Sequence, residues 1–478
     1  MSATLTQSVP HIVPPLDPGF RPAILANRAF REAVRRSGHG TPLRIALERG
    51  DDLVTIFDTE VYEERSHRLE ENLSHVERLL KTLLWARGGF RATIGGSAAI
   101  AEHLQATYAP GGEREFDYRF FSEEVYERPL QIVSCPFEDA PVQCEAPVAL
   151  GRHLDGCRIG LDLGGSDRKV SAVIDGEPVY SEEVVWHPKT SSDPRYHIEG
   201  IEAALRSAAG HLPRVDAIGV SAAGIYVDNR ARVASLFRLI PRDEFAARIT
   251  NLFIEIGERW GVPIEVANDG DVTALAGSMS LGATSVLGIA MGTSEAAGYV
   301  DRRGSISGWL NELAFVPVDV STQAPVDTEW SQDRGTGVLY FSQDAVSRYC
   351  DRAGVVLEGE DPEEKLAWAQ ELMKRGDGRV ERVFETIGVC FGYGLAHYAD
   401  FYDIAEVLVL GRVTSERGGD IIVEQARRVL AAEFPELAET IRVELPDEKS
   451  KRVGQSIAAA SLPAPLDSEG KAHLQREK

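Results

Sequence analysis

The apolar residues of the first 150 positions follow two different periods. Alternating apolar and polar residues on both sides of Gly50-Asp51-Asp52 predict a β-hairpin over residues 42–61. Leucine and valine then recur at steps of three and four, which places them on one face of a helix over residues 63–88. Two further strands and a helix are expected at 90–94, 130–135 and 97–108. With a proline-rich extended arm at residues 1–22, these elements predict a small α+β segment.

A different pattern begins after a linker, rich in proline and acidic residues, at residues 136–147. Three short strands are followed by a helix, a strand, a second helix and another strand. The strands are expected at 158–163, 169–174, 179–185, 215–220 and 264–267, and the second helix at 243–260. A similar order recurs, with strands at 285–290, 298–301 and 407–410 and two long helices between residues 361 and 402. This repetition predicts an α/β protein with two related lobes around a cleft.

We therefore expect the chain to divide into four parts. These are an N-terminal α+β appendage with its arm and linker at residues 1–155, a first lobe at 156–268, a second lobe with a C-terminal helix at 269–461, and a polar tail at 462–478. From its position alone, the appendage is expected to cover the cleft or to build a dimer interface.

The charge and cysteine content narrow the classes of function. The 478 residues include 51 basic and 74 acidic side chains, and the net charge of −23 disfavours phosphate backbones and anionic lipid surfaces as partners. The five cysteines form no CxxC pair, so neither a disulfide framework nor a cysteine zinc site is expected. No long apolar run and no signal peptide is visible. We expect a cytoplasmic enzyme that binds neither nucleic acid nor membrane.

The run Asp162-Leu163-Gly164-Gly165-Ser166 follows a predicted strand. A glycine pair lets backbone N–H groups face phosphate oxygens, and the hydroxyl of Ser166 adds a donor. An aspartate at the strand end stands where a metal ion would bridge phosphates. The alternative is a β-hairpin with a glycine turn and a solvated aspartate.

The run Asn268-Asp269-Gly270-Asp271 lies between a predicted strand and a predicted helix. An aspartate in this place can accept a proton from a substrate hydroxyl as that hydroxyl attacks phosphorus, while Asn268 holds a neighbouring hydroxyl. The alternative is that these residues cap the helix, because Asn and Asp are favoured there. Gly292-Thr293 and Gly411 mark two more small-residue turns after strands, of a type that also occurs in ordinary loops.

Taken in order, these runs resemble the motifs of the ROK sugar kinases, a family of the actin-like ATPase superfamily with ribonuclease-H-like lobes. The first phosphate motif resembles IGLDLGGSDRKVSAVIDG, and the segment with the catalytic aspartate resembles PIEVANDGDVTALAGSMSLGA. The sugar-domain loop, second phosphate motif, sugar motif and adenosine strand resemble AIGVSAAGIYVDNRARV, VLGIAMGTSEAAGYV, SGWLNELAF and GLAHYADFYDIAEVLVLGRV. The resemblance covers about residues 158–459, so this chain looks like a divergent member with an extra N-terminal segment.

The resemblance implies a role for each matched residue. Asp269 would be the general base, and Asn268, Gly224 and Glu312 would bind the sugar. Asp162 would orient Mg²⁺. The phosphates of ATP would lie against Gly164, Gly165, Ser166, Gly292 and Thr293, and the adenosine beside Gly411. The implied activity is transfer of a phosphoryl group from ATP to a hydroxyl of a sugar or cyclitol, by a homodimer.

Four residues or segments depart from the family pattern. Phe315 stands where the family has a sugar-binding histidine, and residues 315–349 lack the cysteines of its zinc loop, so structural zinc is not expected. Glu295 replaces a glycine after the second phosphate motif, and a carboxylate there costs affinity for phosphates unless it faces away. Arg412 follows Gly411, where it would stack on a base or block it.

Three functions remain open on the sequence alone. The first is an ATP-dependent sugar kinase. The second is a catalytically silent sugar sensor that acts through protein contacts, which Glu295 and Arg412 favour. The third is a carbohydrate-processing enzyme that uses Asp269 and Glu312 as a carboxylate pair.

Overall fold

A computed structural model describes residues 9–50, 53–145, 150–446 and 454–464. The chain forms two compact units. Unit 1 contains Met1–Glu145, Ile289–Ala297 and Leu310–Leu445. Unit 2 contains Ala146–Gly288, Gly298–Trp309 and Pro446–Lys478. The chain therefore passes between the units several times, and the N-terminal segment belongs to the same compact unit as residues 310–445.

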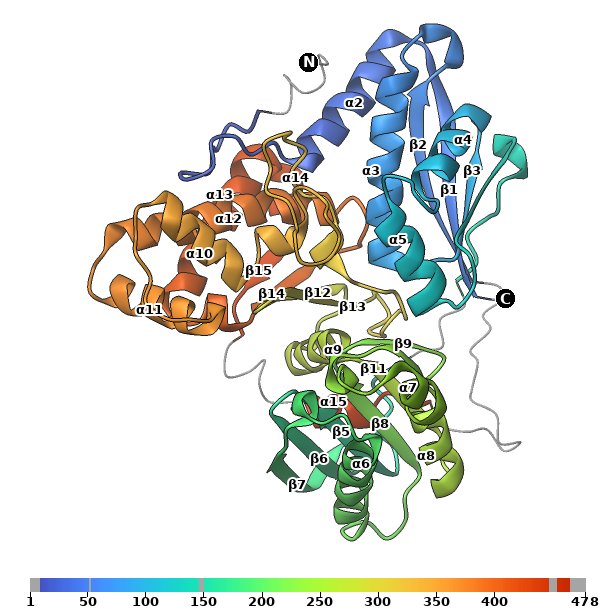
Figure 1. Ribbon diagram of the computed structural model, residues 1–478, viewed down its shortest axis with the longest axis vertical. Coiled ribbons are helices and arrows are strands. Elements are labelled where there is room, and N and C mark those ends of the chain that lie inside the picture. The colour runs from blue at the N-terminus through green and yellow to red at the C-terminus, as the bar shows by residue number, and fades with distance from the viewer. Residues whose placement is uncertain (1–8, 51–52, 146–149, 447–453, 465–478) are drawn as a thin grey trace. The chain divides into compact units, whose positions relative to one another are not determined.

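The N-terminal segment of unit 1 is the expected α+β structure. Its elements are α2 (Ala23–Ser37), β1 (Gly40–Gly50), β2 (Leu53–Tyr62), α3 (Leu69–Arg87), β3 (Arg91–Gly95), α4 (Ala98–Thr107), α5 (Glu115–Arg119) and β4 (Gln131–Cys135). The sheet has the order β2-β1-β3-β4, in which β1 is antiparallel to both neighbours and β3 is parallel to β4. Helix α3 packs on this sheet (Figure 1).

Unit 2 is built around a five-stranded sheet of order β11-β8-β5-β6-β7. Its strands are β5 (Cys157–Leu163), β6 (Asp167–Ile174), β7 (Glu177–Val185), β8 (Ala217–Ala222) and β11 (Ile264–Asn268). Strands β5, β7, β8 and β11 run in one direction, and β6 runs in the opposite direction between β5 and β7. This is the ribonuclease-H-like strand order, so the expected α/β class is confirmed.

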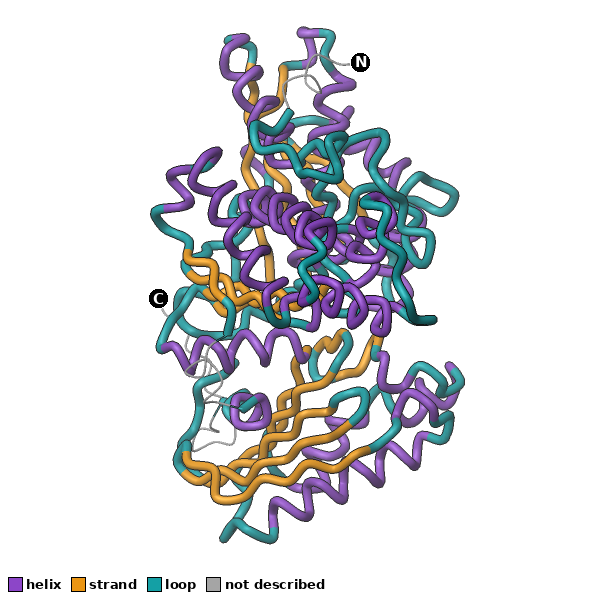
Figure 2. Tube along the Cα trace, turned by 90° about the vertical axis from the view of Figure 1, so that its left-hand side faces the viewer, coloured by secondary structure: helices purple, strands orange, loops and turns teal. Residues whose placement is uncertain are grey.

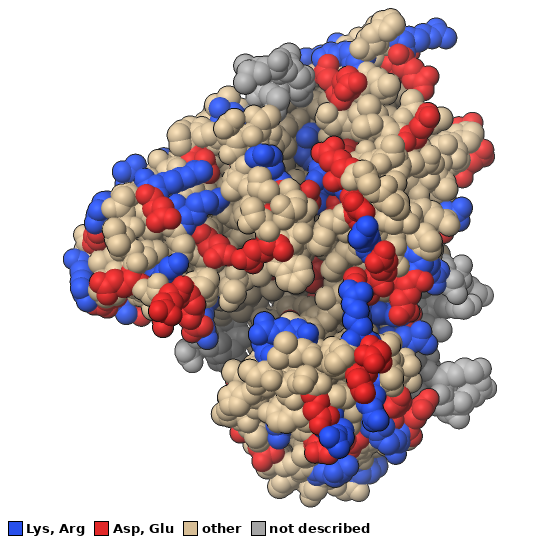
Figure 3. Space-filling model, in the orientation of Figure 1, with Lys and Arg blue, Asp and Glu red and all other residues tan. Residues whose placement is uncertain are grey.

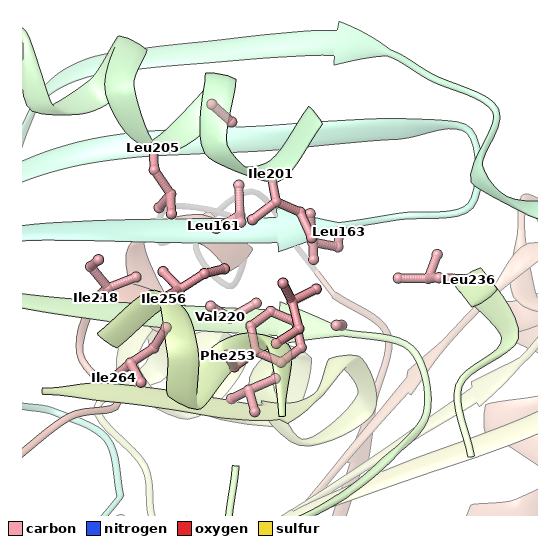
Figure 4. Packing of buried hydrophobic residues seen from close by; sticks show 14 of the residues in the cluster. Leu161, Leu163, Ile201, Leu205, Ile218, Val220, Leu236, Phe253, Ile256 and Ile264 are labelled. Atoms are coloured by element: carbon pink, nitrogen blue, oxygen red, sulfur yellow. The ribbon is translucent and has the colours of Figure 1, made fainter. Parts of the chain in front are cut away.

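Helices cover both faces of that sheet (Figure 2). They are α6 (Pro194–Ala209), α8 (Leu252–Trp260), α9 (Asp269–Leu281) and α15 (Gln455–Ala460). Helix α7 (Arg242–Arg248) contacts α6, and the short hairpin of β9 (Ile225–Val227) and β10 (Arg230–Val233) contacts β11 and α8. Leu161, Val220 and Ile264 of the sheet pack against α6 and α8 in one buried cluster (Figure 4). Every residue of β5 and β8 is buried, as central parallel strands require.

Helix α15 lies directly on the opposite face of the sheet. A Cβ atom at Gly160 of β5 would lie 1.6 Å from the Ser456 carbonyl oxygen, and one at Gly219 of β8 would lie 1.7 Å from that of Ala459. Only glycine permits this approach, so two glycines of the sheet fix the place of the C-terminal helix.

A second sheet has the order β13-β12-β14-β15. Its strands are β12 (Val286–Met291), β13 (Glu295–Val300), β14 (Glu406–Leu410) and β15 (Arg442–Glu444). The helices of this part of the chain are α10 (Gln343–Arg352), α11 (Pro362–Lys374), α12 (Gly378–Tyr398), α13 (Arg417–Glu433) and α14 (Pro435–Ala438), among which α12 and α13 pack along each other.

Some local predictions are wrong. The single helix predicted over 243–260 is two helices, because the Thr250 carbonyl accepts a hydrogen bond from the Ala231 N–H instead of continuing the helix. The predicted linker is not free, since Val54 and Cys144 exchange two backbone hydrogen bonds beside the hairpin. Helices α2, α5 and α10 were not predicted.

Described residues of the predicted extended arm and of the predicted polar tail are packed against the rest of the chain. The arm is irregular at residues 9–22, but Asp17 holds it by a hydrogen bond from Tyr349 and an ion pair with Arg352. In the predicted tail, Leu462 is fully buried and the Pro463 carbonyl accepts a hydrogen bond from Arg158. The hairpin turn at residues 51–52 and the rest of the tail lie outside the described residues.

The predicted division into four parts stays a prediction. The structure places α9 and α15 in unit 2, although both fall in the predicted second lobe. None of the helices in the described part of the chain combines the length and apolar character needed to cross a bilayer. Acidic and basic side chains are interspersed over the face shown in Figure 3.

Candidate active site

Three parallel strands of unit 2 end at one edge of the sheet, and polar residues gather there. The register pairs Asp162 of β5 with Ser221 of β8, and Ser221 with Ala267 of β11. Asn268 ends β11, and Asp269 begins α9. The carboxyl ends of parallel strands are where α/β proteins place ligands. The structure therefore brings Asp162, Asn268 and Asp269 to one edge of this sheet.

Asp162 is a buried carboxylate with one hydrogen-bonded oxygen. The hydroxyl of Ser221 donates to its Oδ1 at 2.8 Å. The pKa of Asp162 is raised to about 6: burial is the largest cause and the charges of Asp269 and Asp167 add to the rise, while the Ser221 bond and the charge of Lys169 lower it. No group among the described residues hydrogen-bonds its Oδ2, so a carboxylate oxygen is available for a hard cation such as Mg²⁺.

Asp269 occupies the first turn of α9 and is half-buried. Burial raises the pKa of its carboxyl, whereas the N–H of Gly270, which donates to Oδ1 at 3.0 Å, and the charge of Lys189 lower it. Gln455 of α15 donates to the Asp269 carbonyl at 3.1 Å and to Thr273 at 2.7 Å, which fixes the start of the helix. A carboxylate made more basic by its surroundings suits proton abstraction.

Asn268 is held from both sides of its amide. Its Oδ1 accepts from the Gly270 N–H at 2.7 Å, and its Nδ2 donates to the Gly224 carbonyl at 2.8 Å. An amide carries two donor hydrogens and two acceptor lone pairs, so each end keeps one position for a ligand. Asn268 caps the helix, as the alternative interpretation held, and still has capacity to bind. Gly224 contributes here through its carbonyl.

The turn after β5 is a tight hairpin. The N–H of Gly164 donates to the Asp167 carbonyl at 2.9 Å, and the Ser166 hydroxyl donates to the Asp167 carboxylate at 2.9 Å. The glycine turn thus agrees with the alternative interpretation as a β-hairpin. That interpretation also predicted a solvated aspartate, and this part is wrong because Asp162 is buried.

Sequence reasoning missed Lys189 at this turn. A Cβ atom at Gly165 would lie 2.8 Å from Cε and Nζ of Lys189, and the charge of Lys189 also acts on Asp269. Lys189 follows the end of β7, which is parallel to β5 and ends at the same sheet edge. The position of Lys189 just after a strand that ends at this edge was the sequence signal that could have identified it.

The second set of predicted residues lies in unit 1. Gly292 and Thr293 form the turn between β12 and β13, in which the Gly292 N–H donates to the Ser294 carbonyl at 2.9 Å. Thr293 is exposed. Gly411 has a φ of +94°, and a Cβ atom there would lie 2.4 Å from the Met291 carbonyl oxygen. The Gly411 turn thus packs against the end of β12, beside the Gly292 turn.

Two of the departures from the family pattern face away from these turns. The side chain of Glu295 is buried, and its Oε1 accepts from the Tyr398 hydroxyl at 3.1 Å. The pKa of Glu295 is raised to about 8, mainly by burial and also by the charge of Glu312, while the Tyr398 bond lowers it. The guanidinium of Arg412 forms an ion pair with Glu363 of α11.

Glu312 is half-buried and lies next to the N-terminal segment. Its backbone N–H donates to the Trp85 carbonyl at 3.0 Å. Phe315, in place of the family's histidine, stacks on the Trp85 ring with 4.2 Å between centroids. An aromatic contact from the N-terminal segment therefore occupies the neighbourhood of Glu312.

The segment in the place of the zinc loop is an ordered loop. The Asp327 carboxylate accepts hydrogen bonds from the N–H groups of Glu329, Trp330 and Ser331 at 3.1, 3.2 and 2.8 Å. Trp330 is 62% exposed. Across the described ranges, no group of three His, Cys, Asp or Glu side chains is arranged to hold a metal ion.

Solved structures of ROK family proteins match this chain. A ROK glucokinase from Streptomyces griseus, in complex with glucose and AMPPNP, is 24% identical, with 64% of this chain and 98% of that chain covered and a TM-score of 0.45. A ROK hexokinase from Thermus thermophilus is 21% identical, with 64% and 97% covered and a TM-score of 0.49. A ROK family transcriptional regulator, described as a homologue of the E. coli MLC protein, is 16% identical, with 65% and 79% covered and a TM-score of 0.49.

No family model and no curated protein matches the chain. At these identities and TM-scores the three matches assign no residue and no activity.

Proposed function

We propose that this protein is an ATP-dependent kinase that phosphorylates a hydroxyl group of a sugar or a sugar-like polyol, as its resemblance to ROK kinases implies. The observation that carries the proposal is the pair of carboxylates at one sheet edge, Asp162 and Asp269, each with a raised pKa. Phosphoryl transfer needs one carboxylate at the attacking oxygen and another toward the metal that accompanies the phosphates.

In the proposed reaction, Asp269 accepts the proton of the substrate hydroxyl as its oxygen bonds to the γ-phosphorus of ATP. The bond between that phosphorus and the oxygen bridging to the β-phosphate breaks, and ADP leaves with the electron pair. Asn268 orients the substrate through its remaining donor and acceptor positions. Lys189 balances negative charge at the Gly165 turn.

Asp162 is the residue proposed to hold Mg²⁺. Mg²⁺ usually keeps several waters and takes one or two carboxylates plus substrate phosphates, so a single protein carboxylate with an available oxygen fits. When bound, the ion would neutralise charge on the transferred phosphoryl group.

The proposed roles in unit 1 are contacts to ATP and to the sugar. The Gly292-Thr293 turn is proposed to contact phosphates and Gly411 the adenosine, since both turns expose backbone next to the end of β12. Glu295 and Arg412 do not oppose this, because each is engaged elsewhere. Glu312 is proposed to bind sugar hydroxyls, and Phe315 cannot replace the lost hydrogen bond of a histidine.

The test is release of ADP by the purified chain with Mg²⁺-ATP and D-glucose, D-mannose, D-glucosamine, N-acetyl-D-mannosamine or myo-inositol. Release that depends on one of these acceptors supports the kinase. Calorimetric binding of an acceptor without any ADP release would instead identify a sugar sensor. Turnover of a glycoside without nucleotide would identify a carbohydrate-processing enzyme.

A further inference from the structure

The end of helix α3 is joined to the segment that carries Glu312 by two backbone hydrogen bonds. The N–H of Asn311 donates to the Ala86 carbonyl, and the N–H of Glu312 donates to the Trp85 carbonyl, each at 3.0 Å. Carbonyl groups in the last turn of a helix lack a partner within the helix. Both elements belong to unit 1, so α3 supplies acceptors that fix the backbone at Glu312.

Side-chain contacts of Trp85 also stabilise the contact between α3 and the Glu312 segment. The Trp85 ring stacks on Phe315, and its indole N–H donates to Asp117 at 2.7 Å. Asp117 also binds the ammonium group of Lys81 at 2.8 Å, and the side chains of Lys81 and Asp117 are each 1% exposed. Because Lys81 holds the buried Asp117 carboxylate in place, the hydrogen bond to that carboxylate restricts the orientation of the Trp85 indole.

Tyr402 contacts both partners of the backbone hydrogen bond between Asn311 and Ala86. Its hydroxyl lies 2.9 Å from Oδ1 of Asn311 and 3.3 Å from the Ala86 carbonyl oxygen. One hydrogen-bonded network therefore connects α3, the Glu312 segment and the loop after α12.

We propose that the C-terminal end of α3 is part of the substrate site and that Trp85 is a positioning residue that holds Glu312 for the hydroxyl groups of the acceptor. This inference rests on the proposed function, in which Glu312 binds the acceptor. A carboxylate whose backbone is fixed before binding loses less conformational entropy when the acceptor arrives. The N-terminal segment, which looks like an addition to the kinase pattern, is then required for acceptor binding.

The test compares Trp85→Phe with Trp368→Phe, a half-buried tryptophan of α11 in the same unit. Trp85→Phe removes the indole donor and shrinks the stacked ring but keeps an aromatic side chain. With the best acceptor of the five named above, its KM should rise about tenfold, while kcat and the KM for ATP change less than twofold. Trp368→Phe should change none of these values. A general loss of folded protein would lower kcat and leave both KM values unchanged.

Hydrogen exchange at two amides provides the second measurement. In the chain without acceptor, the Asn311 and Glu312 amides should exchange about tenfold faster in Trp85→Phe than in the native chain. An unchanged acceptor KM in Trp85→Phe overturns the inference. If none of the five acceptors is phosphorylated by the native chain, the proposed function fails. Unchanged exchange at Glu312 would then overturn the positioning role separately.

Discussion

The hydroxyl of Ser221 donates a hydrogen bond of 2.8 Å to the Asp162 carboxylate, between the neighbouring strands β8 and β5. Burial is the main cause that raises the pKa of Asp162, and the Ser221 bond opposes this rise, so that the pKa lies at about 6 with the bond in place. The bond thus favours the ionised form of the carboxylate that we propose to hold Mg²⁺.

Replacing Ser221 by alanine should move the acid limb of the pH–rate profile. Without the hydroxyl the pKa of Asp162 rises, so the ionised form appears at higher pH. A hydrogen bond to a charged group contributes about 1.5 kcal/mol, which corresponds to about one pH unit. The measurement is kcat/KM for ATP from pH 5 to pH 8. The control Ser207→Ala, which removes a hydroxyl bonded to Tyr180, should leave the limb in place. An unshifted limb in Ser221→Ala would contradict the role given to Asp162.

Gly224→Ala should destabilise unit 2 more than Gly261→Ala. Gly224 has a φ of +133°, and a Cβ atom there would lie 2.4 Å from the Val233 carbonyl oxygen. Gly261 has a φ of +67° with nothing within 4 Å of its Cβ position. We expect losses in unfolding free energy of about 3 kcal/mol and about 1 kcal/mol respectively, from urea titrations. Equal losses would show that the Gly224 loop can move, and Asn268 would then not be held by it.

Glu295→Gln should change the pH dependence of stability. The ordinary pKa of 4.5 applies to the unfolded chain, whereas burial raises the folded pKa to about 8. The folded chain therefore binds more protons between these values, and native stability falls as pH rises through this window. Glutamine cannot ionise, so the variant should gain stability relative to the native chain from pH 4.5 to pH 8, by up to about 5 kcal/mol.

The measurement for Glu295 is urea unfolding at several pH values, with the exposed Glu329→Gln as the control. That control should follow the native chain at every pH. A constant difference between Glu295→Gln and the native chain would mean that Glu295 is ionised in the fold.

Lys81→Met should destabilise unit 1 strongly. Lys81 bridges the buried carboxylates of Asp117 and Asp333, and methionine leaves both without this cation. Removing one partner of a buried ion pair costs about 3–5 kcal/mol. Lys374→Met, which breaks a solvent-exposed pair with Glu416, should leave the free energy of unfolding nearly unchanged. Thermal and urea unfolding compare the two variants, and similar small losses would contradict a structural role for the buried network.

Much of the fold could be predicted from local patterns. The strand predicted at 158–163 is β5 (Cys157–Leu163). Its bounds could be predicted because the apolar run and the glycine turn that ends it are both local features of the sequence. Helix α2 was missed although Ile24, Phe30 and Val34 lie on its buried face, since the proline-rich arm before it hid the start of the helix. The break between α7 and α8 depends on a hydrogen bond to β10, which no local period records.

In the candidate site, too, local sequence patterns predict some residues and miss the contacts between distant segments. Asp162 and Asp269 stand at strand ends, so the sequence rule for α/β sheets finds both. The stacking of Trp85 on Phe315 joins residues far apart in the chain, and neither residue carries a motif for it. Such contacts depend on how distant segments pack, which composition and period leave open.

The measurement that tests the central claim most directly is kcat in Asp269→Asn, measured as acceptor-dependent ADP release. Asparagine keeps the shape of the side chain and removes the base, so kcat should fall by about 100- to 10,000-fold while the acceptor still binds by calorimetry. Asp243→Asn, at an exposed aspartate of α7 in the same unit, should retain native kcat. Native kcat in Asp269→Asn would contradict the proposed general base and, with it, the proposed reaction.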